Sequence, residues 1–369
     1  MTRTPTIADV ARLAGVGKGT ASRAISGNGA VSPETLARVR EAVAALNFRP
    51  SNAARALSTK RTGMVGIYVH DFAGDFFGPI LQAVDGELRG ANRHMVAANG
   101  CGLGVGAGPD DGDARQRALD GIRFLIEREC DGVLVVSNAL SSEDLDMLWS
   151  EKAPLVVLNQ TSPSKPEHCF STDHELAGRL AAHALLQQGH RELACISGLH
   201  TAPDNALRMA GFHAELAQHG VIIPPSHQRE GQFSFDGGHA AAQALLAQGL
   251  DFSALFCAND TMAMAAIACL GKAGVKVPDQ LSVLGFDDSV LARYTTPALS
   301  TVRVPSVDMA ANGCRFLLNL CYGLTLPVQR EFPPEVVWRD SVRPGPHANE
   351  STPAVQVKVA RKRSPTFKA

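Results

Sequence analysis

One glycine-rich run has residue types that could bind a dinucleotide. Gly102-Leu103-Gly104-Val105-Gly106-Ala107 loosely fits the pattern G-x-G-x-x-A. In that pattern the backbone approaches a pyrophosphate at the N-terminus of a helix that follows immediately. Here Pro109-Asp110-Asp111-Gly112 intervenes before any predicted helix. We therefore interpret residues 99–113, rich in glycine and acid, as a surface loop.

The pair His174-Glu175 could begin a zinc-binding helix. That motif needs a second histidine four residues after the first, and Gly178 occupies this position. The sequence also has no P-loop lysine motif and no G-x-S-x-G nucleophile elbow. These absences argue against an enzyme, and we predict neither a cofactor nor a metal site.

The cysteines have no metal-binding or disulfide pattern. There are eight, at positions 101, 130, 169, 195, 257, 269, 314 and 321, without a Cys-x-x-Cys pair. Reduced, mostly buried thiols are therefore expected. No apolar run approaches the roughly 20 residues that span a bilayer, and the N-terminus lacks the apolar core of a signal peptide. We expect a cytoplasmic protein that does not enter a membrane.

Charge is unevenly distributed, although the net charge is only −1. Residues 1–62 have a charge of +7, residues 63–344 have −12 and residues 345–369 have +4. A basic head on an acidic body is typical of a protein that binds nucleic acid or an anionic surface. Residues 345–369 are predicted to be a disordered basic tail, which could contact DNA without sequence preference.

Three short helices are predicted in the head. Thr6 can cap the first, which Gly15 ends; a second fits Lys18 to Ile25; a third begins at Ser32-Pro33. Two helices joined by a short turn and braced by a third form a helix-turn-helix arrangement.

Beyond Met64 the sequence alternates between short β-rich runs and amphipathic helices. The runs are 65–69, 132–136, 155–158, 193–196, 254–257 and 281–286; the helices lie near 79–91, 113–129, 174–189, 205–219, 237–249, 260–273 and 306–322. This alternation predicts an α/β body of two doubly wound parallel-sheet lobes with a ligand cleft between them. The predicted domains are a head at 1–50, a hinge helix and linker at 51–62, a body at 63–344 and the tail at 345–369.

Continuous runs of the sequence resemble the lactose/galactose repressor (LacI/GalR) family of bacterial transcriptional regulators. The head carries the resemblance from Thr6 to Gly27, then in Val31-Ser32 and Phe48-Arg49-Pro50. In the body it continues through Asp75-Phe76-Phe77-Gly78, Asn259-Asp260, Gly285-Phe286-Asp287-Asp288 and residues 292–302, which look closest to the galactose-repressor branch. The body then resembles the two-lobed fold of periplasmic binding proteins.

The resemblance implies a recognition helix that begins near Gly17, where the family usually has a serine. Lys18, Gly19 and Arg23 would face base edges in the major groove, with Arg23 suited to a bidentate contact with guanine. Phosphate contacts are expected from Thr20 and Ser22. The other DNA-binding positions implied in the head are Thr6, Asn28 and Arg49.

In the family, the segment after Pro50 becomes a hinge helix in the minor groove when paired with its twin on DNA. Leu57 would be the apolar wedge that opens the central base step, and Asn52, Ala53 and Arg55 would line the helix. Separating the two hinges of a dimer would melt them and release the DNA.

The resemblance also implies an effector site between the lobes. Arg208, Asn259 and Asp287 would grip a sugar from the second lobe, because each of these groups can make two hydrogen bonds to adjacent hydroxyls. Asp287 could instead be a helix cap. Stacking is expected from Phe77 and Phe233, and first-lobe contacts from Asp71, Asp75 and Asn138, with Asp173 as a supporting contact. Because neighbouring side chains point apart, only one of Phe76 and Phe77 should face the cleft.

Together these features predict a homodimeric repressor of a carbohydrate-utilisation operon. It would bind a pseudo-palindromic operator and release it when a mono- or disaccharide binds. Two alternatives remain at this point: a corepressor-dependent regulator, as purine repressors of the same family are, and a sugar receptor or sugar-modifying enzyme with an accessory head.

Overall fold

The computed structural model describes residues 5–26, 30–48, 61–72, 76–100, 111–151 and 153–348. The chain divides into two compact units, Met1–Gly63 and Met64–Ala369. The first unit contains α1 (Ile7–Leu13), α2 (Lys18–Ser26) and α3 (Pro33–Ala45). None of the helices within the described residues is both long enough and apolar enough to cross a bilayer.

Local sequence signals account for the three head helices. The Asp9 carboxylate accepts hydrogen bonds from the Thr6 N–H (2.9 Å) and hydroxyl (2.7 Å) at the start of α1. Gly15, just beyond α1, has φ 66°, where glycine is favoured. At α3, the Ser32 hydroxyl accepts from the Thr35 N–H at 3.3 Å. A small core holds the helices together and consists of Val10, Ala14, Val39 and Ala42. The predicted head helices are confirmed.

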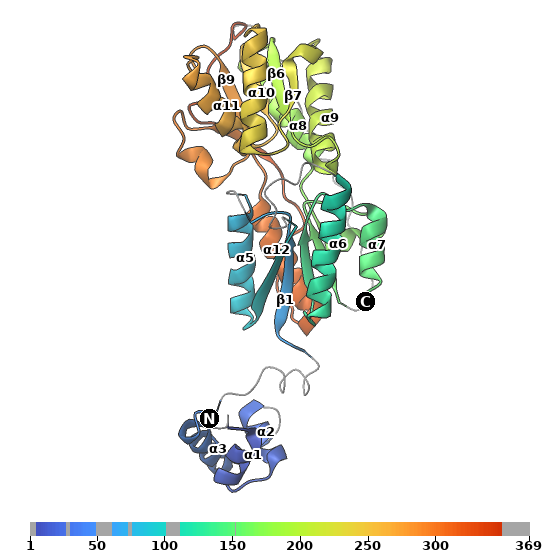
Figure 1. Cartoon of the computed structure of the whole chain (residues 1–369), viewed down its shortest axis with the longest axis vertical. Coiled ribbons are helices and arrows are strands. Elements are labelled where there is room, and N and C mark those ends of the chain that lie inside the picture. The colour runs from blue at the N-terminus through green and yellow to red at the C-terminus, as the bar shows by residue number, and fades with distance from the viewer. Residues whose placement is uncertain are drawn as a thin grey trace. The chain divides into compact units, whose positions relative to one another are not determined.

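A five-stranded parallel sheet forms the first lobe of the second unit, in the order β2-β1-β3-β4-β5. The strands are β1 (Met64–Val69), β2 (His94–Asn99), β3 (Val133–Val136), β4 (Leu155–Leu158) and β5 (Cys169–Phe170). One face packs on α5 (Phe77–Gly90) and α12 (Ser306–Tyr322), and the other on α6 (Asp111–Glu127) and α7 (Ser142–Trp149) (Figure 1).

The second lobe is built on a six-stranded sheet in the order β11-β10-β9-β8-β6-β7. Its strands are β6 (Leu193–Ser197), β7 (Gln228–Glu230), β8 (Ala254–Cys257), β9 (Ser282–Asp287), β10 (Ser300–Arg303) and β11 (Glu335–Val337), of which β11 alone is antiparallel to its neighbour. Helices α8 (His174–Gln187) and α9 (Pro203–Gln218) cover one face, and α10 (Phe235–Gln248) and α11 (Asp260–Lys272) cover the other. Short 3₁₀ helices lie at Pro166–His168, Pro225–His227 and Val290–Arg293.

The chain crosses between the lobes three times. It passes from β5 to α8, returns from β10 to α12, and leaves α12 again for β11. Because α12 packs on α5 and on the first-lobe strands, each lobe contains segments far apart in the sequence (Figure 1).

The predicted fold class is confirmed, with corrections of detail. The loop prediction for residues 99–113 is wrong at both ends, because Asn99 ends β2 and α6 already begins at Asp111. Strands β2, β5, β7, β10 and β11 and helix α7 were not predicted. Seven cysteines lie within the described residues; all are free thiols and six are buried.

Candidate functional site

One face of α2 is exposed and basic. Lys18, Gly19, Ser22 and Arg23 are exposed, whereas Ala21 is fully buried against the head core. The 3.6-residue helical repeat puts the four exposed positions on one side. A Cβ on Gly19 would meet nothing within 4 Å, so this side of α2 offers open space between the two cations. Such a face can present hydrogen-bond donors to base edges.

Gly17 immediately precedes α2 and accepts its first helical hydrogen bonds. The Gly17 carbonyl accepts hydrogen bonds from the N–H groups of Thr20 and Ala21, both at 3.0 Å. A Cβ on Gly17 would meet nothing within 4 Å, so the fold would accept the serine that the family usually has there. Thr20 is half-buried, and the Thr6 hydroxyl is held by Asp9. The remaining DNA-contact predictions fall outside the described residues: Asn28, Arg49, Asn52, Ala53, Arg55 and Leu57.

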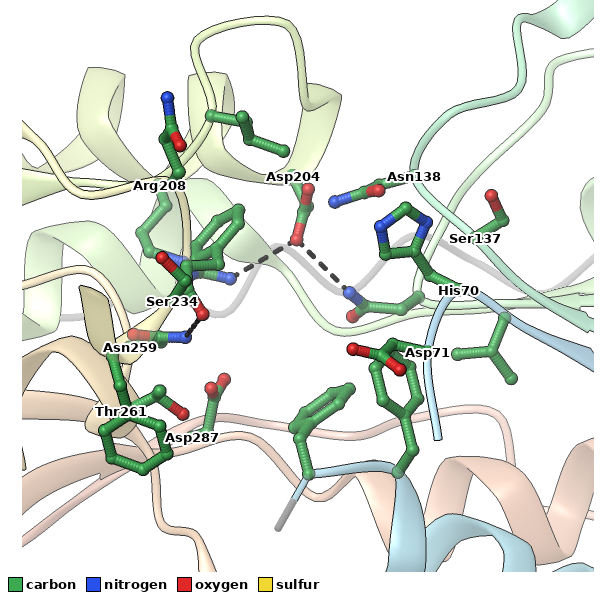
Figure 2. Close-up of a pocket in the computed structure, with 18 residues that line it drawn as sticks. His70, Asp71, Ser137, Asn138, Asp204, Arg208, Ser234, Asn259, Thr261 and Asp287 are labelled. Atoms are coloured by element: carbon green, nitrogen blue, oxygen red, sulfur yellow. Dashed lines mark hydrogen bonds and ion pairs between the residues drawn. The ribbon is translucent and has the colours of Figure 1, made fainter. Parts of the chain in front are cut away.

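A pocket of about 430 Å³ lies between the lobes. Seven of the residues proposed to bind the effector line it: Asp71, Phe77, Asn138, Arg208, Phe233, Asn259 and Asp287 (Figure 2). Most of them follow strand ends, since the carboxyl ends of parallel strands in each lobe meet at one edge, which is where α/β sheets bind ligands. The volume suits a small organic ligand.

Arg208 is held almost entirely inside the second lobe. Its side chain is 3% exposed, and one Nη donates to the Ala258 carbonyl. The guanidinium carbon lies 3.8 Å from the centre of the Phe286 ring, and Nη2 lies 3.5 Å from Asp204 Oδ2. These contacts fix the direction of the guanidinium at the pocket wall (Figure 2).

A buried polar network joins Arg208 to the first lobe. Asn159 Nδ2 donates to Asp204 Oδ2 at 3.4 Å, and His174 Nε2 donates to Asn159 Oδ1 at 2.9 Å. His174 Nδ1 then faces Arg208 Nη2 at 3.5 Å. Burial, and next the positive charge of Arg208, lower the pKa of His174 to about 4, so the imidazole is neutral. Asn159 and Asp204 therefore connect the two sides of the pocket.

Asp287 has an unusual backbone. It ends β9 with φ 113°, and the following Asp288 has φ 57°, both in the region that favours glycine. Asp288 is anchored by Arg303 Nε at 2.7 Å and by Arg339, which hold its pKa below the usual range although burial acts to raise it. Neighbouring ion pairs thus support the backbone that turns Asp287 toward the pocket (Figure 2).

Asn259 has two roles in the geometry. Its Oδ1 accepts from the Met262 N–H at 2.8 Å and caps α11, while its Nδ2 donates to the Phe233 carbonyl at 3.2 Å. Phe233 has φ 57°. A Cβ added at Gly198 would lie only 2.0 Å from the Phe233 ring. Gly198 therefore allows the ring to reach the pocket wall.

One prediction about the pocket is wrong. Phe76 and Phe77 both line it, with ring centroids 5.2 Å apart. The alternation expected of a strand does not apply, because Phe77 begins α5 and adjacent residues on a helix are only about 100° apart. Asp173, expected as a supporting contact, lies outside the pocket lining and caps α8 by accepting from the Leu176 N–H at 2.9 Å. Asp75 is outside the described residues.

Several lining residues were missed by the sequence analysis. They are His70, Val136, Ser137, Asn159, Leu199, Asp204, Gln232, Ser234, Phe235 and Thr261. A signal existed for Asp204, since it is four residues before Arg208 on one helix and can pair with it. Ser137 and Asn159 directly follow β3 and β4, so their position at strand ends was also available.

Comparison with known proteins gives the same order of domains. Residues 6–51 match the model described as bacterial regulatory proteins of the lacI family, and residues 182–342 match a periplasmic binding protein-like domain. The transcriptional regulators AscG and GalR of Escherichia coli K12 are each 32% identical over 91% of this chain and over 98% and 95% of their own lengths. The repressor PurR of Vibrio cholerae is also 32% identical, over 92% of this chain and 98% of its own. These equal identities do not single out the galactose branch.

Solved structures agree in fold. A regulator of the LacI family from Burkholderia phymatum is 43% identical, with a TM-score of 0.71 over 76% of this chain and 99% of that one. The regulator CelR in complex with cellobiose is 29% identical, with a TM-score of 0.62 over 91% of this chain and 99% of its own. These relatives are transcriptional regulators rather than enzymes. With identity extending over nine-tenths of the chain, through both the head and the two-lobed body, this protein belongs to the lacI family of bacterial transcriptional regulators.

Proposed function

We propose that this regulator is a homodimeric repressor that releases its operator when a mono- or disaccharide binds between the lobes. The observation that carries the proposal is the composition of the pocket. Carboxylate, amide and guanidinium groups of both lobes surround it, with the rings of Phe77 and Phe233 in the lining. Such groups can hydrogen-bond to adjacent hydroxyls while the rings cover the apolar face of a sugar.

Each predicted domain has a proposed role. Residues 1–50 would read the operator, 51–62 would form the hinge, 63–344 would bind the effector and pair two chains, and 345–369 would be a tail. Lys18, Gly19 and Arg23 would face bases, with Thr20, Ser22 and Thr6 at the backbone, and the protein would act in the cytoplasm. The exposed basic face of α2 supports this assignment.

The test needs an operator and a ligand. Operator sequences would be selected from random duplexes with the full-length chain, and sugars would be screened by thermal shift. A ligand at 100 times its dissociation constant should stabilise the fold by about 2.7 kcal/mol. Fluorescence anisotropy of the labelled operator should then fall as the same sugar is added. An operator-bound complex that no stabilising sugar affects would contradict the proposal.

Asp287→Ala separates the two activities. We expect it to bind the operator normally and to lose the response to the sugar, because Asp287 lines the pocket in the body while the head contacts DNA. Asp236→Ala is the matched control, since Asp236 is an exposed acid near the start of α10 and does not line the pocket. Normal release by Asp287→Ala would remove Asp287 from the effector site.

A corepressor-dependent regulator is the second candidate. PurR, a repressor, matches this chain as well as GalR does. Whether a ligand loosens or tightens DNA binding depends on which body conformation it favours. In the anisotropy experiment, a ligand that raises operator affinity would select this alternative.

A further inference from the structure

Helices α8 and α9 pack backbone against backbone. A Cβ on Gly178 would lie 1.9 Å from the Arg208 carbonyl oxygen, and one on Gly211 would lie 2.0 Å from the Glu175 carbonyl oxygen. Glycine at both positions thus permits the close approach. The contacts of His174 with Arg208, of Glu175 with Gly211 and of Arg179 with Glu215 rise together along both helices, so the helices run in the same direction. One turn further on, His183 of α8 faces Glu215 and His219 at the end of α9.

These three side chains have the geometry of a metal site. Glu215 Oε1 lies 3.5 Å from His183 Nδ1 and 3.4 Å from His219 Nε2, and the three ligand atoms are within 4.8 Å of one another. A tetrahedral zinc ion with bonds of 2.0–2.1 Å has ligand–ligand distances of about 3.3 Å. Two of the three distances already match, and rotation of the two imidazole rings can shorten the third.

The facing atoms lack hydrogen bonds. Glu215 is 2% exposed, yet neither its Oε1 nor His183 Nδ1 has a hydrogen-bond partner in the described structure. Buried polar atoms are almost always paired, and an unpaired one indicates a water or an ion.

The surroundings suit a bound cation. Arg179 Nη1 lies 3.6 Å from Glu215 Oε2 and its Nη2 lies 3.1 Å from Glu175 Oε1, so Arg179 engages the carboxylate oxygen that points away from the two histidines. A charged neighbour of this kind orients a metal ligand. The side chains of His183 and His219 are 13% and 17% exposed, which leaves a path for the ion and a fourth position for water.

We propose that His183 Nδ1, Glu215 Oε1 and His219 Nε2 bind one divalent transition-metal ion, with zinc as the best fit to two imidazoles and a carboxylate. None of the three residues lines the pocket between the lobes. The site would be separate from the effector site and would join α8 to α9.

The test uses untagged, full-length protein that has been stripped with a chelator. Titration calorimetry with zinc chloride should give one ion per chain, and thermal unfolding should shift upward by roughly 5 °C at 100 times the dissociation constant. His219→Ala and Glu215→Gln each change a direct ligand. Each should therefore weaken zinc binding by at least about 10–100-fold, which is the usual effect of losing a residue that only orients a ligand. His200→Ala should bind as the unchanged protein does, since His200 pairs with Glu230 at 3.1 Å but is part of no three-ligand cluster among the described residues.

Cobalt(II) supplies an independent readout. Its visible absorption should be that of a tetrahedral site with nitrogen and oxygen donors and no thiolate charge-transfer band. Binding below half an equivalent, a thiolate band, or unchanged affinity in both variants would overturn the proposal. Should His219→Ala fail to fold, Glu215→Gln, which keeps the shape of the buried side chain, gives the decision.

Discussion

At the scale of single residues, Arg23 should determine one base pair of each half-site. It is exposed on α2, where its Nε donates to the Gly19 carbonyl at 3.3 Å, so it is held along the helix toward the open space at Gly19. Arg23→Ala should weaken operator binding by about 1–3 kcal/mol, and relax specificity at one position. Anisotropy against a panel of single-base operator variants measures this. An equal loss on every sequence would make Arg23 a phosphate contact.

His174 should make stability depend on pH. Its pKa is about 4 in the folded protein against 6.5 for an ordinary histidine, so between these values the unfolded chain binds more protons. Above pH 6.5 His174 is neutral in both the folded and the unfolded protein, so it does not lower the free energy of unfolding. As the pH falls toward 4, the unfolded chain becomes protonated first, and the free energy of unfolding decreases. At pH 5 the loss relative to pH 7.5 should be about 2 kcal/mol.

Denaturant unfolding at the two pH values tests this expectation. His174→Gln should show a pH dependence smaller by that amount. Identical pH dependence in the variant and the unchanged protein would mean that His174 does not titrate in this range.

Residue types and motif positions were enough to predict seven residues of the pocket lining, but not its buried network. Asn159, His174 and Asp204 are brought together from two lobes, and no spacing in the sequence connects them. No spacing in the sequence connects His183 with Glu215 either, because they are 32 positions apart in the chain. Phe76 and Phe77 were misjudged because the rule for a strand was applied to the first turn of a helix.

At the scale of elements, the contact between α8 and α9 should be intolerant of side chains. Gly178→Ala would place a Cβ 1.9 Å from a backbone oxygen, and backbone cannot move aside cheaply. We expect the free energy of unfolding to fall by at least about 1–3 kcal/mol. Gly271→Ala on α11, where a Cβ meets nothing within 4 Å, should instead gain about 0.4–1 kcal/mol. Chemical denaturation compares the two, and similar effects would contradict this account of the packing.

Most elements were predictable because apolar periodicity survives in buried segments. Strand β2 lies at the sheet edge and has no fully buried residue. It was missed because its apolar run, Met95 to Ala98, is short and half alanine, which favours a helix more than a strand. Strands β5 and β7 are two and three residues long, too short to give a pattern. Helix α12 was predicted by its apolar face, but that face does not specify which sheet it will cover.

At the scale of the whole molecule, DNA binding should weaken steeply with salt. The basic charge is concentrated in the head, whereas the body is acidic. The logarithm of the binding constant should fall with the logarithm of salt concentration, with a slope of about −0.9 for each phosphate neutralised. Footprinting should also show two symmetric half-sites, as expected for a two-fold dimer. A flat salt response or a single unsymmetric site would contradict the proposed assembly.

The three crossings between the lobes also set an order in time. The strands of the first lobe are complete at Phe170, but α12, which covers one face of that sheet, ends only at Tyr322, about 150 residues later. At roughly 5–20 residues per second, synthesis takes on the order of 10–30 seconds to span that interval. During this time the sheet face against which α12 will pack, including Leu134 and Leu158, lacks its cover. The nascent chain is therefore at its greatest risk of aggregation before the ribosome has reached α12.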